Sequence, residues 1–212
     1  MNILASRWQD FAQIKEVDEP VAPSLFGCAH PLRFIKEVIT PSYAVQLEFI
    51  EYDLEGKYSR SGYYGRRNRQ YSMGFVHANA LSKAKVEQYV NSLSRGYELG
   101  LVCKADLYFE AHHIPVIDFI SENKEECREV LARLAAKHSA SNETIKYRLY
   151  SSGRSFHGYL GKMITDRMWR LNWLIDLRRE PTVDQDWIQH SLERGYSVLR
   201  WSNQRKPPIL RV

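Results

Sequence analysis

Apolar and polar residues alternate with a period of two over residues 42–54, which is typical of a half-buried strand. Shorter apolar runs predict further strands at residues 71–78, 101–109, 114–121, 147–160 and 196–201. Apolar residues spaced three and four apart predict helices at residues 81–95, 123–137, 165–179 and around 187–192. We therefore expect an α+β fold, a mainly antiparallel sheet with helices packed on it, in which residues 110–113 form a turn that leaves His112 and His113 exposed.

The first 40 residues have a different pattern. Trp8, Phe11 and Ile14 have helical spacing, and a series of prolines and a glycine follows them. We expect residues 1–40 to form a short helix and an extended arm packed on the core. Residues 41–212 would then form the main domain.

Composition limits the class of protein. The 212 residues are 44% hydrophobic, which suits one compact globular unit, and the net charge of +5 mildly favours a polyanionic partner. The three cysteines are too scattered for a zinc knuckle or a disulfide framework, which favours a reducing compartment. No secretory signal and no apolar run long enough to span a bilayer is present, so we expect a soluble, cytoplasmic protein with no membrane partner.

A basic, aromatic segment separates the first two predicted strands. It contains no acidic residue, and its candidate nucleic-acid contacts are Lys57, Arg60, Tyr63, Tyr64, Arg66, Arg67 and Arg69. Arginines pair with phosphates, and tyrosine rings stack on unpaired bases. The segment predicts a hairpin tip that binds single-stranded DNA or RNA, and a solvated flexible tip is the alternative.

Polar residues interrupt two of the predicted apolar strands. Asp118 lies in the β-branched run 114–121, where a buried carboxylate needs a cation or hydrogen bonds. Ser155 and His157 are two residues apart, so a strand would place both on one face. The predicted strand–helix–strand crossover from 114–121 to 147–160 would bring Asp118 and His157 together if the two strands are neighbours.

These residues resemble the archaeo-eukaryotic primase (primase-polymerase) superfamily, in which an apolar strand ending in Asp-x-Asp, a Ser-x-His strand and a third acidic residue surround metal and nucleotide. Ser155-Phe156-His157 matches the second motif, whereas Asp118-Phe119-Ile120 matches half of the first. Residues 183–187 look like the late acidic motif, and residues 196–202 look like the basic strand after it. The resemblance spans about residues 101–202 and implies an RRM-like, primase-like core.

The resemblance also implies roles for individual residues. Asp118, His157 and Asp184 would be catalytic, and the nucleotide would bind Arg154, Ser155, His157 and Arg200. Metal would bind Asp118 and Asp184, with Glu122 or Asp186 as a candidate further ligand. Mg²⁺ or Mn²⁺ is the implied cofactor if the protein is active, and none is implied otherwise. The alternative for each acid is helix capping, and for His157 it is a structural role.

Three functions stay open. The first is a primase-like subunit that binds nucleic acid or nucleotide, is catalytically degenerate because Ile120 replaces the second acid, and works in replication, repair or anti-phage defence beside a helicase or nuclease. The second is an active metal-dependent nucleotidyltransferase that uses a nucleoside triphosphate. The third is a purely structural interaction subunit. No phosphate-loop, dinucleotide-binding or Gly-x-Ser-x-Gly sequence is present, which argues against those enzyme classes.

Overall fold

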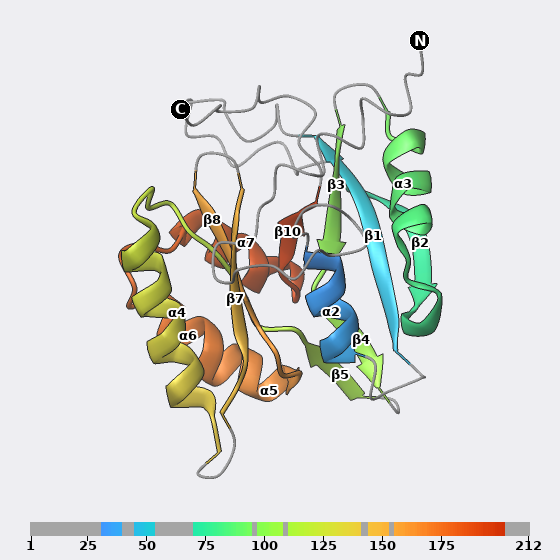
Figure 1. The fold of residues 1–212 in the computed structure, drawn as a ribbon. Helices are drawn as coiled ribbons and strands as arrows, with labels where there is room; N and C mark the ends of the chain where they lie inside the picture. The colour runs from blue at the N-terminus through green and yellow to red at the C-terminus, as the bar shows by residue number, and fades with distance from the viewer. Residues whose placement is uncertain are drawn as a thin grey trace.

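The computed structural model describes residues 31–39, 45–53, 70–94, 97–107, 110–140, 144–152 and 155–201. The predicted helix within residues 1–30, the basic segment 57–69, Arg154 and the tail after residue 201 lie outside this set. The described residues form helices and three antiparallel sheets (Figure 1). The predicted α+β class is confirmed, but the strands are divided among three sheets instead of sharing one.

The largest sheet has the strand order β10-β3-β1-β2. Its strands are β1 (Gln46–Asp53), β2 (Gln70–His77), β3 (Tyr97–Val102) and β10 (Val198–Arg200). Leu47 and Phe49 alternate along β1 and are fully buried. The Phe49 ring lies 5.1 Å from Tyr89 of helix α3 (Lys83–Ser92) and 5.3 Å from Trp201, measured between ring centroids. Helix α3 and the residue after β10 therefore cover the buried face.

The second sheet has the order β6-β8-β7, with β6 (Val116–Asp118), β7 (Tyr147–Ser151) and β8 (Phe156–Leu160). Strands β6 and β7 are each antiparallel to β8, so they are parallel to each other and need the crossover helix α4 (Lys124–His138). A Cβ atom on Gly158 would lie 3.0 Å from Leu131 of α4. Helix α4 thus packs closely on the face of β7 and β8 that is turned away from the largest sheet (Figure 1).

The third sheet has the order β4-β5-β9 and lies at the base of the molecule in Figure 1. Its strands are β4 (Lys104–Leu107), β5 (Glu110–His113) and β9 (Ile164–Thr165). The chain then continues through α5 (Asp166–Met168), the π-helical turn η3 (Trp169–Trp173) and α6 (Leu174–Leu177). In η3 the backbone N–H of Leu174 donates to the carbonyl of Trp169, five residues earlier.

The predicted core helix at 165–179 thus contains a π-turn, and it buries only part of its apolar surface. Trp169 and Trp173 are fully buried, whereas Met168, Leu171 and Ile175 are 40%, 57% and 41% exposed. The tryptophans explain why the sequence resembles a core helix. The exposed stripe is not explained by the packing of the described residues.

Helix starts are set by side-chain caps. Ser82 caps α3 and Asn123 caps α4, as the sequence predicts, and Asp184 caps α7 (Gln185–Arg194). Gly195 ends α7 with φ 77°, in the left-handed region that favours glycine. Helix α2 (Pro31–Ile39) was not predicted from the sequence. None of the described helices is both long and apolar enough to cross a membrane.

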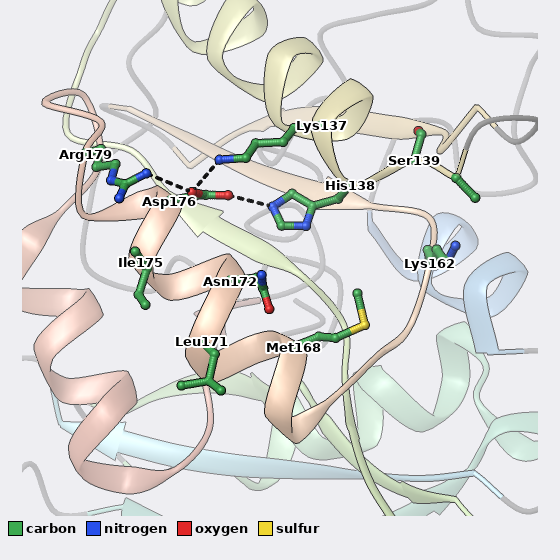
Figure 2. Close-up of a pocket in the computed structure, with 11 residues that line it drawn as sticks. Lys137, His138, Ser139, Lys162, Met168, Leu171, Asn172, Ile175, Asp176 and Arg179 are labelled. Carbon is green, nitrogen blue, oxygen red and sulfur yellow. Dashed lines mark hydrogen bonds and ion pairs between the residues drawn. The ribbon is translucent and has the colours of Figure 1, made fainter.

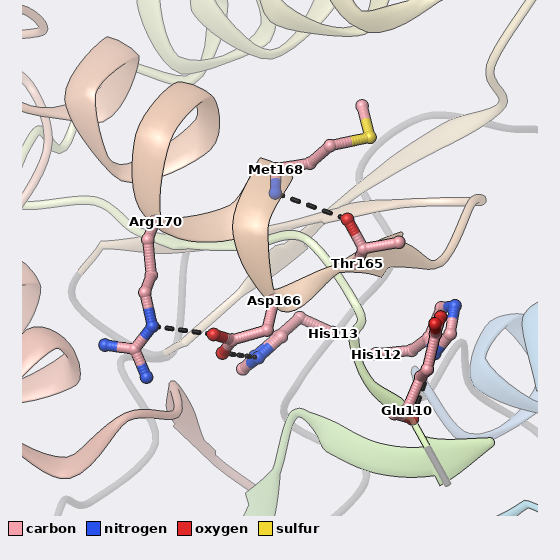
Figure 3. A network of polar contacts seen from close by, with 7 residues as sticks. All are labelled: Glu110, His112, His113, Thr165, Asp166, Met168 and Arg170. Atoms are coloured by element: carbon pink, nitrogen blue, oxygen red, sulfur yellow. Dashed lines mark hydrogen bonds and ion pairs between the residues drawn. The ribbon is translucent and has the colours of Figure 1, made fainter. Parts of the chain in front are cut away.

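The prediction that His113 is an exposed turn residue is wrong. The strand predicted at residues 101–109 is interrupted at Cys103. Residues 104–107 and 110–113 pair as a separate hairpin, and His113 is fully buried at its end. Its ring stacks on Trp169 at 4.1 Å between centroids, and its Nε2 lies 2.9 Å from Asp166 Oδ1 (Figure 3). Stacking and this hydrogen bond make burial of the imidazole tolerable. His112 is half-buried in β5, so it too belongs to a strand.

Candidate functional site

Asp118 and His157 face each other across the β6–β8 ladder. Directly opposed residues of antiparallel strands point to the same face, and here His157 Nε2 lies 3.6 Å from Asp118 Oδ1. This separation exceeds a good hydrogen bond, but the two groups attract whenever the imidazole is protonated. The side chain of His157 is 4% exposed and that of Asp118 is 21% exposed. Asp118 is therefore the member of the pair that a ligand can reach.

Asp184 lies on the other side of Asp118. Its backbone N–H donates to the carbonyl of Asp118 at 2.9 Å, and a bridge between Phe119 and Val183 fixes the register. This pairing places His157 of β8, Asp118 of β6 and Asp184 before α7 at adjoining positions, and we call these three residues the acidic row. Asp184 Oδ1 also accepts a hydrogen bond of 2.9 Å from the N–H of Trp187. One of its two carboxylate oxygens is thus used to cap α7.

The turn between β7 and β8 lies next to the acidic row. The N–H of Ser152 donates to the carbonyl of Ser155 at 2.9 Å, and the two hydroxyl oxygens are 3.1 Å apart. Arg200 of the largest sheet donates from Nη2 to the carbonyl of Ser152 at 2.6 Å. Ser155 precedes His157 by two residues and lies directly before β8. The structure thus brings Ser155, His157 and Arg200 to one region, although His157 belongs to one sheet, Arg200 to another and Ser155 to a turn.

The face that carries the acidic row turns toward the largest sheet. Tyr159 is two residues beyond His157, and its hydroxyl accepts a hydrogen bond of 3.3 Å from Nε1 of Trp201. Burial raises the pKa of Tyr159 well above its ordinary value, and the nearby charge of Asp118 raises it further. Tyr159 therefore stays a neutral hydrogen-bonding group. The acidic row lies where two sheets meet, with this neutral aromatic contact beside it.

A family model for the archaeo-eukaryotic primase 1D-like proteins matches residues 77–208. The match covers more than half of the chain and includes the acidic row and Arg200. The chain belongs to this primase-like family. It is therefore related to nucleotidyltransferases that in general bind nucleotides and nucleic acid and use divalent metal ions. No curated protein and no solved structure matches the chain.

The carboxylates that the structure describes around Asp118 do not by themselves form a two-ion centre. Among the described residues, no cluster of three or more His, Cys, Asp or Glu side chains is placed to hold a metal ion. Glu122 and Asp186, the candidate further ligands, are both exposed, and Asp186 lies in the first turn of α7. Ile120 is 58% exposed and has no donor atom. Two hard cations need more carboxylate oxygens within a few Å than these positions supply.

Some predicted site residues cannot be placed. Arg154 and the seven candidate contacts in the basic segment lie outside the described residues, so their predicted roles stay predictions.

Two polar residues near the acidic row were missed as candidates. Ser152 contacts both Ser155 and Arg200, and Thr182 has a buried hydroxyl without a hydrogen-bond partner among the described residues. The only sequence signal for either is its position beside a motif.

Proposed function

We propose that this primase-like protein binds a nucleoside triphosphate, carried as its divalent-metal complex, or the end of a nucleic-acid strand at the acidic row, and performs little or no polymerisation by itself. The observation that supports this most is the row itself. Asp118 and His157 are paired across β6 and β8, and Asp184 joins Asp118 through a backbone hydrogen bond, where two sheets meet. The next position on that face is Ile120, which is exposed and cannot coordinate metal.

Charge defines what each residue contributes. A triphosphate approaching Asp118 and Asp184 is repelled unless a cation accompanies it, so the ligand should enter with its own bound metal ion. Arg200 uses one of its five N–H donors on Ser152 and can direct others to phosphate oxygens. The hydroxyl of Ser155 is a second phosphate donor. His157 is too buried to serve as the main contact and instead holds Asp118 in position.

Nucleic-acid binding is the second part of the proposal. The net charge of +5 and the basic segment 57–69 favour an unpaired strand of DNA or RNA held by phosphate contacts and tyrosine stacking. A protein that holds a nucleotide and a strand end without extending them needs a partner to act on them. We therefore propose a role as a subunit in replication, repair or anti-phage defence, beside a helicase or nuclease.

Nucleotide binding can be measured by calorimetry with ATP and Mn²⁺ and compared among three variants. Asp118→Asn and Asp184→Asn should each weaken binding at least about tenfold, because each removes a charged ligand for the metal-nucleotide complex. Asn caps helices as well as Asp, so Asp184→Asn should leave α7 intact. Asp106→Asn, which neutralises an exposed carboxylate of β4 in another sheet, is the matched control and should bind like the native chain. Equal affinity in all three variants would refute the acidic row as the nucleotide site.

An active nucleotidyltransferase is the second candidate function, and the pairing of Asp118 with Asp184 favours it. Primer extension with Mg²⁺ and with Mn²⁺, run beside Asp118→Ala, separates the two. We expect no robust extension by the native chain. Extension that disappears in Asp118→Ala would establish the active enzyme. A chain that binds neither nucleotide nor single strands would instead be a structural interaction subunit.

A further inference from the structure

An open hollow of about 720 Å³ lies between the C-terminal end of α4, Lys162 and the exposed side of the α5–η3–α6 helix (Figure 2). We call it the α4–α6 groove. Its wall on the helix side includes Met168, Leu171 and Ile175, the apolar stripe that the core leaves exposed. From residue 168 to residue 179 the wall is about 16 Å long at 1.5 Å per residue. That length suits about three turns of another helix.

The rim of the groove is cationic. Lys137 and Arg179 are 55% and 71% exposed, and Lys162 lies at the far side. Asp176 is the one acid among the described residues that line the groove, and its side chain is 8% exposed. It contacts Lys137 at 2.7 Å, His138 at 3.0 Å and Arg179 at 3.7 Å (Figure 2). One carboxylate cannot neutralise the two full positive charges of Lys137 and Arg179, so the groove presents an apolar floor beside a positive rim.

This combination selects one kind of occupant. A second copy of the chain in a two-fold contact would bring the same cationic rims together, which is unfavourable. A nucleic-acid strand would use the cations but would leave Leu171 and its neighbours against phosphates. An amphipathic helix with an acidic polar face satisfies both features, because its apolar stripe covers the floor and its carboxylates meet the rim. We propose that the α4–α6 groove binds an acidic amphipathic helix of a partner protein.

The test uses the full chain and a fluorescein-labelled synthetic peptide of 18 residues. The peptide has Leu and Phe along one face of the helix and Glu along the opposite face. A scrambled peptide of the same composition is the ligand control. Leu171→Glu should weaken anisotropy-measured binding at least about tenfold, because it puts a carboxylate into the apolar contact. Arg179→Glu should weaken it about three- to tenfold and reduce its salt dependence.

Matched substitutions elsewhere on the chain keep the test specific. Phe75→Glu changes an exposed aromatic residue of β2, and Arg167→Glu reverses an exposed charge on α5 outside the groove. Both should bind the peptide like the native chain. All four altered side chains are exposed, so circular dichroism and thermal unfolding should show intact folds.

Three results would overturn the proposal. The first is absence of saturable binding, or equal binding of the scrambled peptide. The second is displacement of the peptide by a single-stranded oligonucleotide whose own binding is lost in Arg179→Glu, which would assign the groove to nucleic acid. The third is a concentration-dependent dimer, seen by light scattering, that Leu171→Glu dissociates, which would assign the groove to a second copy.

Discussion

Ile120 occupies the position two residues after Asp118, on the same side of the strand. Its side chain is 58% exposed, so a polar replacement costs little packing. Ile120→Asp would add carboxylate oxygens beside Asp118 and Asp184. We expect the affinity for Mn²⁺, measured by electron paramagnetic resonance of the free ion, to rise at least about tenfold, because divalent ions gain strongly from each added carboxylate.

The control for this prediction is Ile175→Asp, which places a carboxylate at an isoleucine that is 41% exposed on α6. It should leave Mn²⁺ affinity unchanged. An equal rise in both variants would mean that the added charge acts non-specifically. No rise in Ile120→Asp would mean that the acidic row does not bind metal even with a third carboxylate.

His113 makes a prediction about stability and pH. Burial lowers the pKa of His113 to about 4, although its hydrogen bond to Asp166 opposes that change. In the unfolded chain the pKa returns to about 6.5, so the unfolded state binds an extra proton between these values. The free energy of unfolding should therefore rise as pH increases from 4 to 6.5 and level off above. From this one residue we expect a loss of about 2 kcal/mol between pH 7.5 and pH 5.

Urea unfolding at pH 7.5 and pH 5 measures this dependence. His113→Phe keeps a ring to stack on Trp169 but removes the titrating group, so its stability should differ less between the two pH values than that of the native chain. Asp166 still contributes to the pH dependence. Burial favours its protonated form, but hydrogen bonds from Arg170 and His113 outweigh burial and lower its pKa. A His113→Phe variant that keeps the full native pH dependence would show that His113 is not its source.

Single residues were predictable where a local rule determines their surroundings. The predicted strand–helix–strand crossover brings Asp118 and His157 together on condition that their strands are neighbours, and the structure meets that condition. His113 was not predictable, because its partners Asp166 and Trp169 lie more than 50 positions away. Nothing in the residues next to His113 indicates that contact.

At the scale of elements, Gly158 determines how closely α4 approaches the β6-β8-β7 sheet. A Cβ atom there would lie 3.0 Å from Leu131 and 3.1 Å from Phe119, both in the core. Gly158→Ala should lower the free energy of unfolding by about 1–3 kcal/mol through overpacking. Chemical denaturation measures this loss. In a Leu131→Val background the added methyl group meets less crowding, so the loss should be smaller, and an unchanged loss would point to backbone conformation as the cause.

Helices that begin with a capping side chain were predicted well. Ser82 and Asn123 mark the starts of α3 and α4, because their side chains accept backbone hydrogen bonds there. The predicted strand 147–160 is instead two strands, β7 and β8, since the turn at Ser152 reverses the chain. The π-turn was not predicted, because its tryptophans keep the four-residue spacing of an α-helix.

At the scale of the whole molecule, the candidate site depends on contacts between sheets. Arg200 reaches Ser152 from the largest sheet, and Trp201 reaches Tyr159. Alternating apolar residues identify strands but do not specify which strands pair, so the division into three sheets could not be predicted from periodicity.

The basic segment gives a prediction for the whole chain. Replacing Arg66, Arg67 and Arg69 with alanine should weaken binding to single-stranded oligonucleotides similarly for all sequences. The slope of log affinity against log salt should fall by up to about two, because each lost phosphate contact removes roughly 0.7. Fluorescence anisotropy at several salt concentrations measures both effects.

The control is alanine at Arg128, Arg133 and Arg167, three arginines of α4 and α5 that remove the same total charge. This variant should change the affinity for single-stranded oligonucleotides, and its salt dependence, much less than the variant of the basic segment does. If both triple variants bind alike, only net charge matters and the basic segment has no special role. Unchanged affinity in the first variant would make the segment a solvated turn.

The helix that runs from α5 through η3 to α6 contains one residue more than a regular α-helix with the same number of turns, because of the π-turn. An α-helix turns about 100° per residue, so deleting one residue within η3 would rotate all that follows by that angle. Leu174 and Leu177 would leave the core, and Asp176 would lose Lys137 and His138. The extra residue thus sets the phase between two halves of one helix. The first half is aligned by Trp169 against His113 and the second by Asp176 against α4, and a chain one residue shorter could keep only one of these alignments.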